Sequence, residues 1–310
     1  MSTIRLDARA KLNLSLHVVG RVGDVHAITS VMQSLLLSDR LEIEKADETS
    51  LWVSEAGLAD GSNLVCKALR ELEARVGRPL PLAIRLEKEI PAAAGLGGAS
   101  ADAAALLRAA DRIYELGLTG AELSAVGRRV GSDVPFALVG GSAYVAATGE
   151  EVVPLPFLGD LEVLLAVPDP PLLTGQIYAG WDELAAGDAS CLHPDPHRRL
   201  GRIRPGDRRS LAGLLHNDLL EPAARRSPGL RRLLRSWRQV TPLAGMSGSG
   251  PTLFALPVDR SETEELERLA RREGARIFRT RFARSGVVVR EGSRERGARI
   301  GIQAGRPAKG

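Results

Sequence analysis

The chain has 310 residues, of which 44% are hydrophobic and only 4% aromatic, and it carries a formal net charge of +4. Most of that charge lies in residues 291–310, where five basic side chains stand against two acidic ones. The rest is nearly neutral and poor in aromatic rings, which excludes a basic surface interleaved with stacking side chains. We therefore expect no nucleic-acid partner.

Length and cysteine content bear on domain number and compartment. Because a single core rarely grows beyond roughly 250 residues, the length predicts two domains. Cys66 and Cys191 are the only cysteines, the N-terminus has no apolar signal segment, and no apolar run reaches the length of a membrane span. We expect a cytoplasmic protein with no membrane partner, as a monomer or weak homodimer.

In the first half, alternation indicates strands and helical periodicity indicates helices. Residues 11–18, KLNLSLHV, alternate strictly and predict a half-buried strand with one polar face. The other elements expected here are strands at 35–44 and 82–90, a helix at 62–77 with Ser62 as N-cap, a helix from about 100 to 116, a helix from Thr119 with a capping box to Glu122, and a strand, turn and strand over 144–156.

The proline- and glycine-containing segment PLPFLG at 154–159 interrupts the pattern and predicts a domain boundary there. The expected domains are 1–156 and 157–290. In the second domain we expect strands at 161–168, 251–258 and 276–282 and helices at 176–186, 211–220, 229–240 and 262–272. Helices and strands mix without a strict βαβ repeat, so we predict an α+β fold. Residues 193–210 and the tail 291–310 have the composition of segments without regular structure.

The segment PAAAGLGGASADAAALL, residues 91–107, carries the sharpest functional signal. It joins a predicted strand directly to a predicted helix, so backbone N–H groups of the loop and first helical turn converge on one volume. Its small side chains let phosphate approach the backbone, and the helix dipole adds attraction. It lacks the lysine of a Walker A loop and the third glycine of a dinucleotide fingerprint. We predict a triphosphate site of another type; the alternative is a flexible connection into an Ala-rich helix.

That loop, Pro-x-x-x-Gly-Leu-Gly-Gly-x-Ser, resembles the second motif of the GHMP kinase superfamily of galactokinase, homoserine kinase, mevalonate kinase and phosphomevalonate kinase. ARAKLNLSLHVVGR near the start and GSDVPFAL at 131–138 resemble blocks of its diphosphocytidyl-methylerythritol kinase family, and SNLV, HNDL and MSGSGPTLF follow in that family's order. The resemblance spans about residues 8–256.

The resemblance implies a two-domain GHMP kinase fold with the active site in the cleft between the domains. It also implies that ATP, with Mg²⁺, phosphorylates the 2-hydroxyl of diphosphocytidyl-methylerythritol. Two alternatives stay open. One is a GHMP-type kinase for another small alcohol, such as homoserine or an isoprenoid precursor. The other is a non-catalytic binding protein with the same fold.

Site residues follow from the same resemblance. Asp133 is expected to be the catalytic base, with Lys11 holding it ionised and polarising the alcohol and Asn13 orienting the substrate hydroxyls. Mg²⁺ is expected to arrive with ATP near Ser100, without a dedicated protein site. The remaining expected contacts are Pro91, Ala92, Ala93, Ala94, Gly95, Leu96, Gly97, Gly98, Ala99, Ser100 and Ala101 with phosphates, Asn63 and Lys88 with adenine, and Gly248 and Ser249 with the substrate.

These residues also have simpler interpretations. Lys11 could be a lysine at a strand edge, and Asp133 could cap the turn before a Val-Pro pair. Asn13 could be a solvated strand residue. Asn63 and Lys88 could be a helix-start residue and an exposed strand lysine.

The chain departs from the family where the base is recognised. The family has Gly-Arg-x-x-Asp-Gly-Tyr-His-Glu after its first strand, whereas this chain reads GRVGDVHA from Gly20, one residue shorter and with Val25 in place of tyrosine. In the family the tyrosine stacks on cytosine and the histidine hydrogen-bonds it. His26 is therefore expected to keep its contact, and Tyr178 is the candidate for a second aromatic side chain.

The arginine- and proline-rich stretch of the second domain contains three residues of types that can bind zinc. Cys191, His193 and His197 lie there without a clear fourth ligand, so no zinc site is expected.

Overall fold

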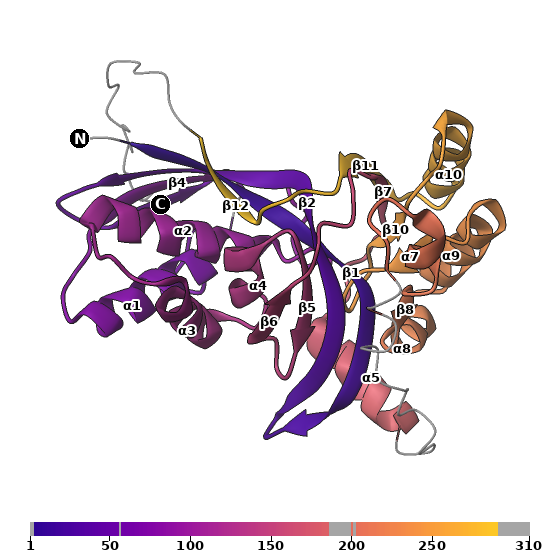
Figure 1. Ribbon diagram of the computed structural model, residues 1–310, viewed down its shortest axis with the longest axis horizontal. Helices are drawn as coiled ribbons and strands as arrows, with labels where there is room; N and C mark the ends of the chain where they lie inside the picture. Colours follow the sequence, from indigo (N-terminus) through magenta and orange to yellow (C-terminus); the bar gives the residue numbers. More distant parts are fainter. Residues whose placement is uncertain (1–2, 56, 186–199, 201–202, 291–310) are drawn as a thin grey trace, which may run out of the picture.

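The computed structural model describes residues 3–55, 57–185, 200 and 203–290. It contains an eight-stranded sheet and a four-stranded sheet, each with helices packed against it (Figure 1). This arrangement confirms the expected α+β fold. Within the described part of the chain, no helix is both long and apolar enough to cross a bilayer. Cys191, His193, His197 and the tail 291–310 lie outside the described residues.

The first sheet is organised around one long hairpin. Strands β1 (Ile4–Val22) and β2 (Val25–Lys45) pair antiparallel through a two-residue turn at Gly23 and Asp24, and bulges interrupt the register at three places. The sheet order is β12-β1-β2-β4-β3, with β5 on β2, β6 on β5 and β8 on β1. The bounds are β3 (Ser50–Val53), β4 (Leu82–Glu87), β5 (Ser142–Ala146), β6 (Glu151–Pro154), β8 (His216–Asn217) and β12 (Val287–Arg290).

Helices α1 (Leu64–Val76), α2 (Gly98–Tyr114), α3 (Gly120–Val130) and α4 (Val134–Val139) cover one face of this sheet. The alanines of α2 let it lie close to the sheet, and nine of its residues are buried. The capping box of Thr119 and Glu122 is confirmed. The expected N-cap Ser62 is wrong: Asn63 accepts from the Val65 amide at 2.9 Å, whereas Ser62 bonds Asp60.

The start of α2 also differs from expectation. The helix begins at Gly98 rather than near Ser100, because Gly97 adopts a left-handed conformation at its N-cap. The helix α4 was not anticipated. It begins directly after Asp133, with a proline in its first turn, where proline fits without loss of a hydrogen bond.

The second sheet has the antiparallel order β11-β7-β10-β9 and carries the helices of the second half. Its strands are β7 (Glu162–Val167), β9 (Ala244–Met246), β10 (Leu253–Ala255) and β11 (Arg276–Arg281); its helices are α5 (Thr174–Ala185), α7 (Arg208–Ala212), α8 (Leu220–Arg226), α9 (Pro228–Val240) and α10 (Arg260–Arg272). Trp237 is fully buried in this core, and its indole N–H donates to the Leu266 carbonyl at 2.9 Å.

Two expectations for the second half are corrected. The helix expected at 211–220 is divided, because residues 216–217 pair with β1 as a short parallel strand. The stretch 193–210, expected to lack regular structure, lies only partly within the described residues, and its last residues begin helix α7.

The chain returns to the first sheet at its described end. Strand β12 pairs antiparallel with β1, so residues 287–290 belong to the first sheet although the expected second domain included them. The strand β8 makes a second such link. Both β12 and β8 therefore pair with β1, on the side opposite β2.

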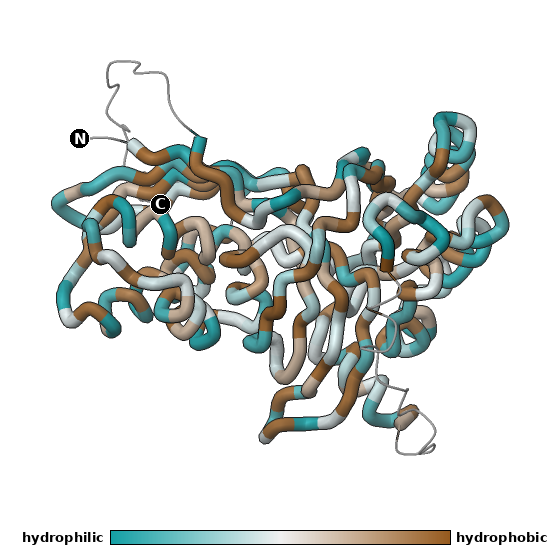
Figure 2. The backbone as a smooth tube through the Cα atoms, viewed as in Figure 1, coloured by the Kyte–Doolittle hydropathy of each residue, from teal (hydrophilic) through white to brown (hydrophobic). Residues whose placement is uncertain are grey.

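The expected half-buried strand at 11–18 is buried on both faces. Leu12 and Leu14 are covered on one side, and on the other Lys11 is only 7% and Asn13 only 2% exposed. The polar face is covered because two loops lie against it. One is the predicted phosphate-binding loop at 91–100, called the phosphate loop below, and the other is the loop at 246–249. In Figure 2 hydrophobic positions run along the central strands, and hydrophobic and hydrophilic positions are mixed at the tip of the β1–β2 hairpin.

Candidate active site

A cavity of about 560 Å³ lies between the two halves, within the size range of small-molecule sites. It is lined by the phosphate loop and β1 from the first half and by α5 and the 248–249 loop from the second. Most of the predicted site residues line it: Lys11, Asn13, Asn63, Lys88, Pro91 through Ser100, Asp133, Tyr178, Gly248 and Ser249. The exceptions are His26, whose ring stacks on that of Tyr178, and Ala101, which is buried on α2.

The phosphate loop has the geometry expected of an anion site. Gly95 and Gly97 have φ values of +75° and +70°, in the left-handed region that favours glycine. No side chain caps the N-terminus of α2, so the N–H groups of its first turn face the loop without a side-chain acceptor. Phosphate oxygens can fill that role, supported by the helix dipole.

Lys11 and Asp133 meet at the floor of the cavity. The Lys11 ammonium lies 3.3 Å from an Asp133 carboxylate oxygen and donates to the Asn13 amide oxygen at 2.6 Å. The Asp133 side chain makes no capping bond to α4, although its residue occupies the N-cap position. Because the carboxylate is a quarter exposed and turned toward Lys11, it can reach a substrate hydroxyl.

Ser247, which is not among the predicted site residues, links the loop at 246–249 to the phosphate loop. Its hydroxyl donates to the Gly95 carbonyl at 2.9 Å and accepts from the backbone N–H of Asn13 at 3.2 Å. The Asn217 side chain donates to the carbonyls of Met246 and Gly248, both at 2.9 Å. The sequence signal was present, since Ser247 stands inside the MSGSG segment. Its role depends on two loops that only the fold brings together.

Lys88 does not extend freely toward the cavity, because two buried carboxylates hold its ammonium group. It pairs with Asp39, which is fully buried, and with Asp102 at 2.6 Å. Asp39 also accepts from the amides of Glu89 and Ile90, at 2.6 and 2.8 Å. These contacts fix the end of the strand that precedes the phosphate loop. An adenine contact for Lys88 stays a prediction.

The buried trio of Lys88, Asp39 and Asp102 contains two carboxylates for one ammonium group. Burial raises the pKa of Asp102 well above its ordinary value, because Lys88 alone cannot offset both negative charges in a dry site. One of its oxygens has no hydrogen-bond partner. The charges also raise the pKa of Lys88 although burial opposes that change.

This imbalance predicts how Asp102→Asn changes stability with pH. A carboxyl whose pKa is raised by folding stabilises the folded state below its unfolded pKa and loses that contribution as pH rises through the folded value. The wild-type protein should therefore lose stability relative to Asp102→Asn as pH rises from about 4. Urea unfolding of both proteins at several pH values measures the difference. A constant difference across pH would contradict the raised pKa.

Asp39→Asn is the contrasting variant. Asp39 accepts from two backbone amides and pairs with Lys88, so its replacement should lower the free energy of unfolding by about 3 kcal/mol.

His26 and Tyr178, predicted as base-recognising residues, come together from opposite halves. Their rings stack with centroids 4.6 Å apart and planes 25° from parallel, and Trp181 meets the His26 ring edge-on at 5.9 Å. Tyr178 lines the cavity, and burial, together with the charge of Asp133, raises the pKa of its hydroxyl well above the ordinary value. Val25 points its side chain into solvent at the hairpin turn and is 53% exposed.

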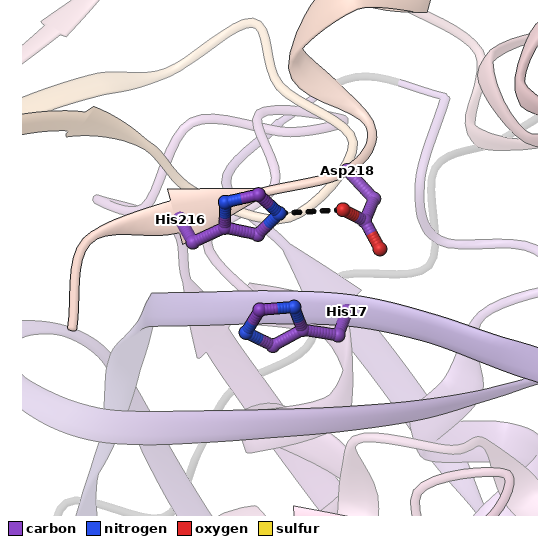
Figure 3. A group of neighbouring side chains, drawn as sticks. All are labelled: His17, His216 and Asp218. Atoms are coloured by element: carbon purple, nitrogen blue, oxygen red, sulfur yellow. Dashed lines mark hydrogen bonds and ion pairs between the residues drawn. The ribbon is translucent and has the colours of Figure 1, made fainter. Parts of the chain in front are cut away.

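A second cluster, His17, His216 and Asp218, links the halves at the β1–β8 pairing (Figure 3). His216 bonds Asp218 at 2.5 Å, and Asp218 accepts from the Val18 amide at 2.8 Å. The two imidazoles stack 4.4 Å apart with planes only 7° from parallel. Ring-nitrogen lone pairs lie in the ring plane, so two parallel rings cannot converge on one metal ion. The cluster therefore joins the halves as it stands and does not form a metal site.

Comparisons with known proteins agree with this geometry. The model of the GHMP kinases N terminal domain matches residues 63–141, and that of the GHMP kinases C terminal matches residues 199–276. The 4-diphosphocytidyl-2-C-methyl-D-erythritol kinase of Moorella thermoacetica is 38% identical over 263 residues, covering 84% of this chain and 92% of the relative. The enzyme of that name from Nocardia farcinica is 40% identical over 258 residues, covering 81% and 84%.

Solved structures show the same likeness. The crystal structure of a 4-(cytidine 5′-diphospho)-2C-methyl-D-erythritol kinase superimposes with a TM-score of 0.72 at 28% identity, over 90% of this chain and 98% of that one. A mevalonate kinase of L. major in complex with R-mevalonate gives 0.70 at 16% identity, over 90% and 96%, which shows the shared fold. The chain belongs to the GHMP kinases, within the family of 4-diphosphocytidyl-2-C-methyl-D-erythritol kinases.

Proposed function

We propose that this protein transfers the γ-phosphoryl group of ATP to the 2-hydroxyl of 4-diphosphocytidyl-2-C-methyl-D-erythritol. The observation that carries the proposal is the Lys11–Asp133 pair, 3.3 Å apart, at the floor of a cavity bounded by the phosphate loop. The membership of the chain in that kinase family supports the choice of substrate.

In this mechanism Asp133 accepts the proton of the substrate hydroxyl as its oxygen bonds to the γ-phosphorus and the bond to ADP breaks. Lys11 lies 3.3 Å from that carboxylate, orients it and, from the same position, stabilises negative charge on the transferred phosphoryl group. Asn13 holds Lys11 through a 2.6 Å hydrogen bond, and its own amide N–H₂ donates to Ser30 at 2.8 Å. Asn13 can therefore position Lys11 as well as orient substrate hydroxyls.

ATP is placed with its phosphates on the amides of the phosphate loop and the first turn of α2. Asn63, which lines the cavity while its side chain caps α1, is placed at the adenine end. The Ser100 hydroxyl lines the same cavity and would be one ligand of a Mg²⁺ ion that arrives with ATP and keeps water and phosphate oxygens as its other ligands. Mg²⁺ neutralises charge on the phosphates when bound. A cytoplasmic location and a monomeric or weakly dimeric state stay predictions.

The cytidine moiety is placed at the end of the cavity where Tyr178 meets His26. If His26 contacts the base, His26→Ala should raise the KM for the cytidyl substrate by roughly tenfold, because the substitution removes one hydrogen bond and part of a stacking contact. The KM for ATP should not change, because ATP binds at the phosphate loop. Steady-state kinetics with each substrate varied in turn measures both values. An equal rise in both KM values would refute the role.

A coupled ADP-release assay with ATP and Mg²⁺ tests the proposed function. We expect turnover with 4-diphosphocytidyl-2-C-methyl-D-erythritol and none with homoserine or mevalonate. The replacement of the family's tyrosine by Val25 favours, as the second candidate, a GHMP kinase acting on another small alcohol. Turnover with homoserine or mevalonate alone would establish that candidate and overturn the first.

A further inference from the structure

Helix α5 holds the His26 imidazole on three sides. Tyr178 stacks on its face at 4.6 Å, Trp181 contacts it edge-on, and Asp182 forms a 2.7 Å hydrogen bond with its Nε2 atom. The other oxygen of Asp182 lies 3.3 Å from the Arg21 guanidinium, which belongs to β1. The His26 side chain is only 9% exposed, so these neighbours fix the ring.

The contact with Asp182 determines which ring nitrogen carries the proton. An ionised carboxylate can only accept hydrogen bonds, so the Nε2 atom of His26 must donate. In a neutral imidazole the other nitrogen, Nδ1, is then an acceptor. Arg21 supports this arrangement, because its guanidinium pairs with the other oxygen of Asp182 and holds the carboxylate in place.

We propose that Asp182 is a positioning residue that makes the His26 Nδ1 atom an acceptor and thereby selects a nucleobase with an exocyclic amino group. Such a group donates to Nδ1. A base with a carbonyl at that position would bring an oxygen lone pair against a nitrogen lone pair. The inference rests on the proposed function, which places the base against His26, and it adds the reason why cytosine is accepted and uracil is rejected.

The test compares the wild-type enzyme with Asp182→Asn and Asp182→Glu on the cytidyl substrate and its uridyl analogue. Glu183→Gln is the matched control, since Glu183 is the exposed neighbour on the same helix. An amide at position 182 can donate to Nε2, which moves the ring proton to Nδ1. The preference in kcat/KM for the cytidyl over the uridyl compound should then fall by roughly tenfold or more. Glu183→Gln should keep the wild-type preference, and Asp182→Glu should restore most of it.

A second measurement reads the tautomer directly. Isotope-edited NMR of the imidazole nitrogens at about pH 8, where imidazoles are mostly neutral, should show His26 protonated at Nε2 in the wild-type protein. In Asp182→Asn the proton should shift toward Nδ1. His26→Gln identifies the signal by its disappearance.

Two results would overturn the inference while leaving the proposed function intact. One is an Nδ1-protonated His26 in the wild-type enzyme. The other is an Asp182→Asn enzyme that loses activity on both compounds in equal proportion. A wild-type protein that is inactive on the cytidyl substrate would instead refute the proposed function and, with it, the proposed base selection. The NMR experiment would still decide whether Asp182 sets the tautomer of His26.

Discussion

Asp133→Asn should lower kcat by about two orders of magnitude or more, with little change in the KM for ATP. The amide has nearly the same shape as the carboxylate but cannot take the proton of the substrate hydroxyl. It also removes the negative charge that lies 3.3 Å from Lys11. The coupled ADP-release assay gives kcat, and ATP titration at saturating second substrate gives the KM.

The matched control for this substitution is Asp47→Asn. Asp47 is exposed in the turn after β2 and does not line the cavity, so the same chemical change should leave kcat unaltered. An Asp133→Asn enzyme with near-normal turnover would remove Asp133 from the mechanism, because no general base can be replaced by an amide at so small a cost.

Gly95→Ala should lower kcat/KM for ATP on the order of 100-fold, as expected when reacting groups are displaced by about 1 Å. A Cβ atom at Gly95 would overlap the Ser247 carbonyl oxygen and lie 3.1 Å from that of Gly250. Both obstacles are backbone atoms, so the phosphate loop or the facing loop must move. Steady-state kinetics with ATP as the varied substrate measures the loss.

Gly77→Ala separates this clash from simple backbone strain. Gly77 has a φ of +72°, close to the +75° of Gly95, but a Cβ there would meet no atom within 4 Å. Both variants should lose about 1–2 kcal/mol of unfolding free energy from the left-handed conformation, and Gly95→Ala should lose more because its Cβ also meets backbone atoms. Only Gly95→Ala should lose activity. Equal activities of the two variants would show that contact between the loops does not set the phosphate geometry.

The buried charges illustrate what could not be predicted from the sequence. Lys88 stands in a strand of alternating pattern and was expected to reach adenine, yet its ammonium group is held between Asp39 and Asp102. The three residues are far apart along the chain. Their side chains meet only because β2, β4 and α2 pack against one another. Asp39, which follows three leucines in LLLSDRLEIE, was the available signal in the sequence. It did not show that Lys88 would be its partner.

The partner of His26 likewise could not be predicted from the sequence. His26 and Tyr178 could each be chosen from the sequence as aromatic or hydrogen-bonding candidates. Asp182 could not, because its role arises only where α5 packs beside the tip of the β1–β2 hairpin. Spacing along one helix places Tyr178, Trp181 and Asp182 on neighbouring positions, but it does not show which strand they meet.

The sequence by itself determined the local features of this protein. Periodicity located most helices and strands, and the small residues between a strand and a helix predicted the phosphate loop, because backbone geometry at such a junction depends on nearby residues alone. Together with the family resemblance, these features predicted Lys11 and Asp133 as the catalytic pair. Only the tertiary structure decided which residues of the two halves meet: Ser247 against Gly95, Asp182 against His26, and Lys88 between two carboxylates. Such contacts join segments distant in the chain, and their distances are set by the packing of whole elements, which no local pattern encodes.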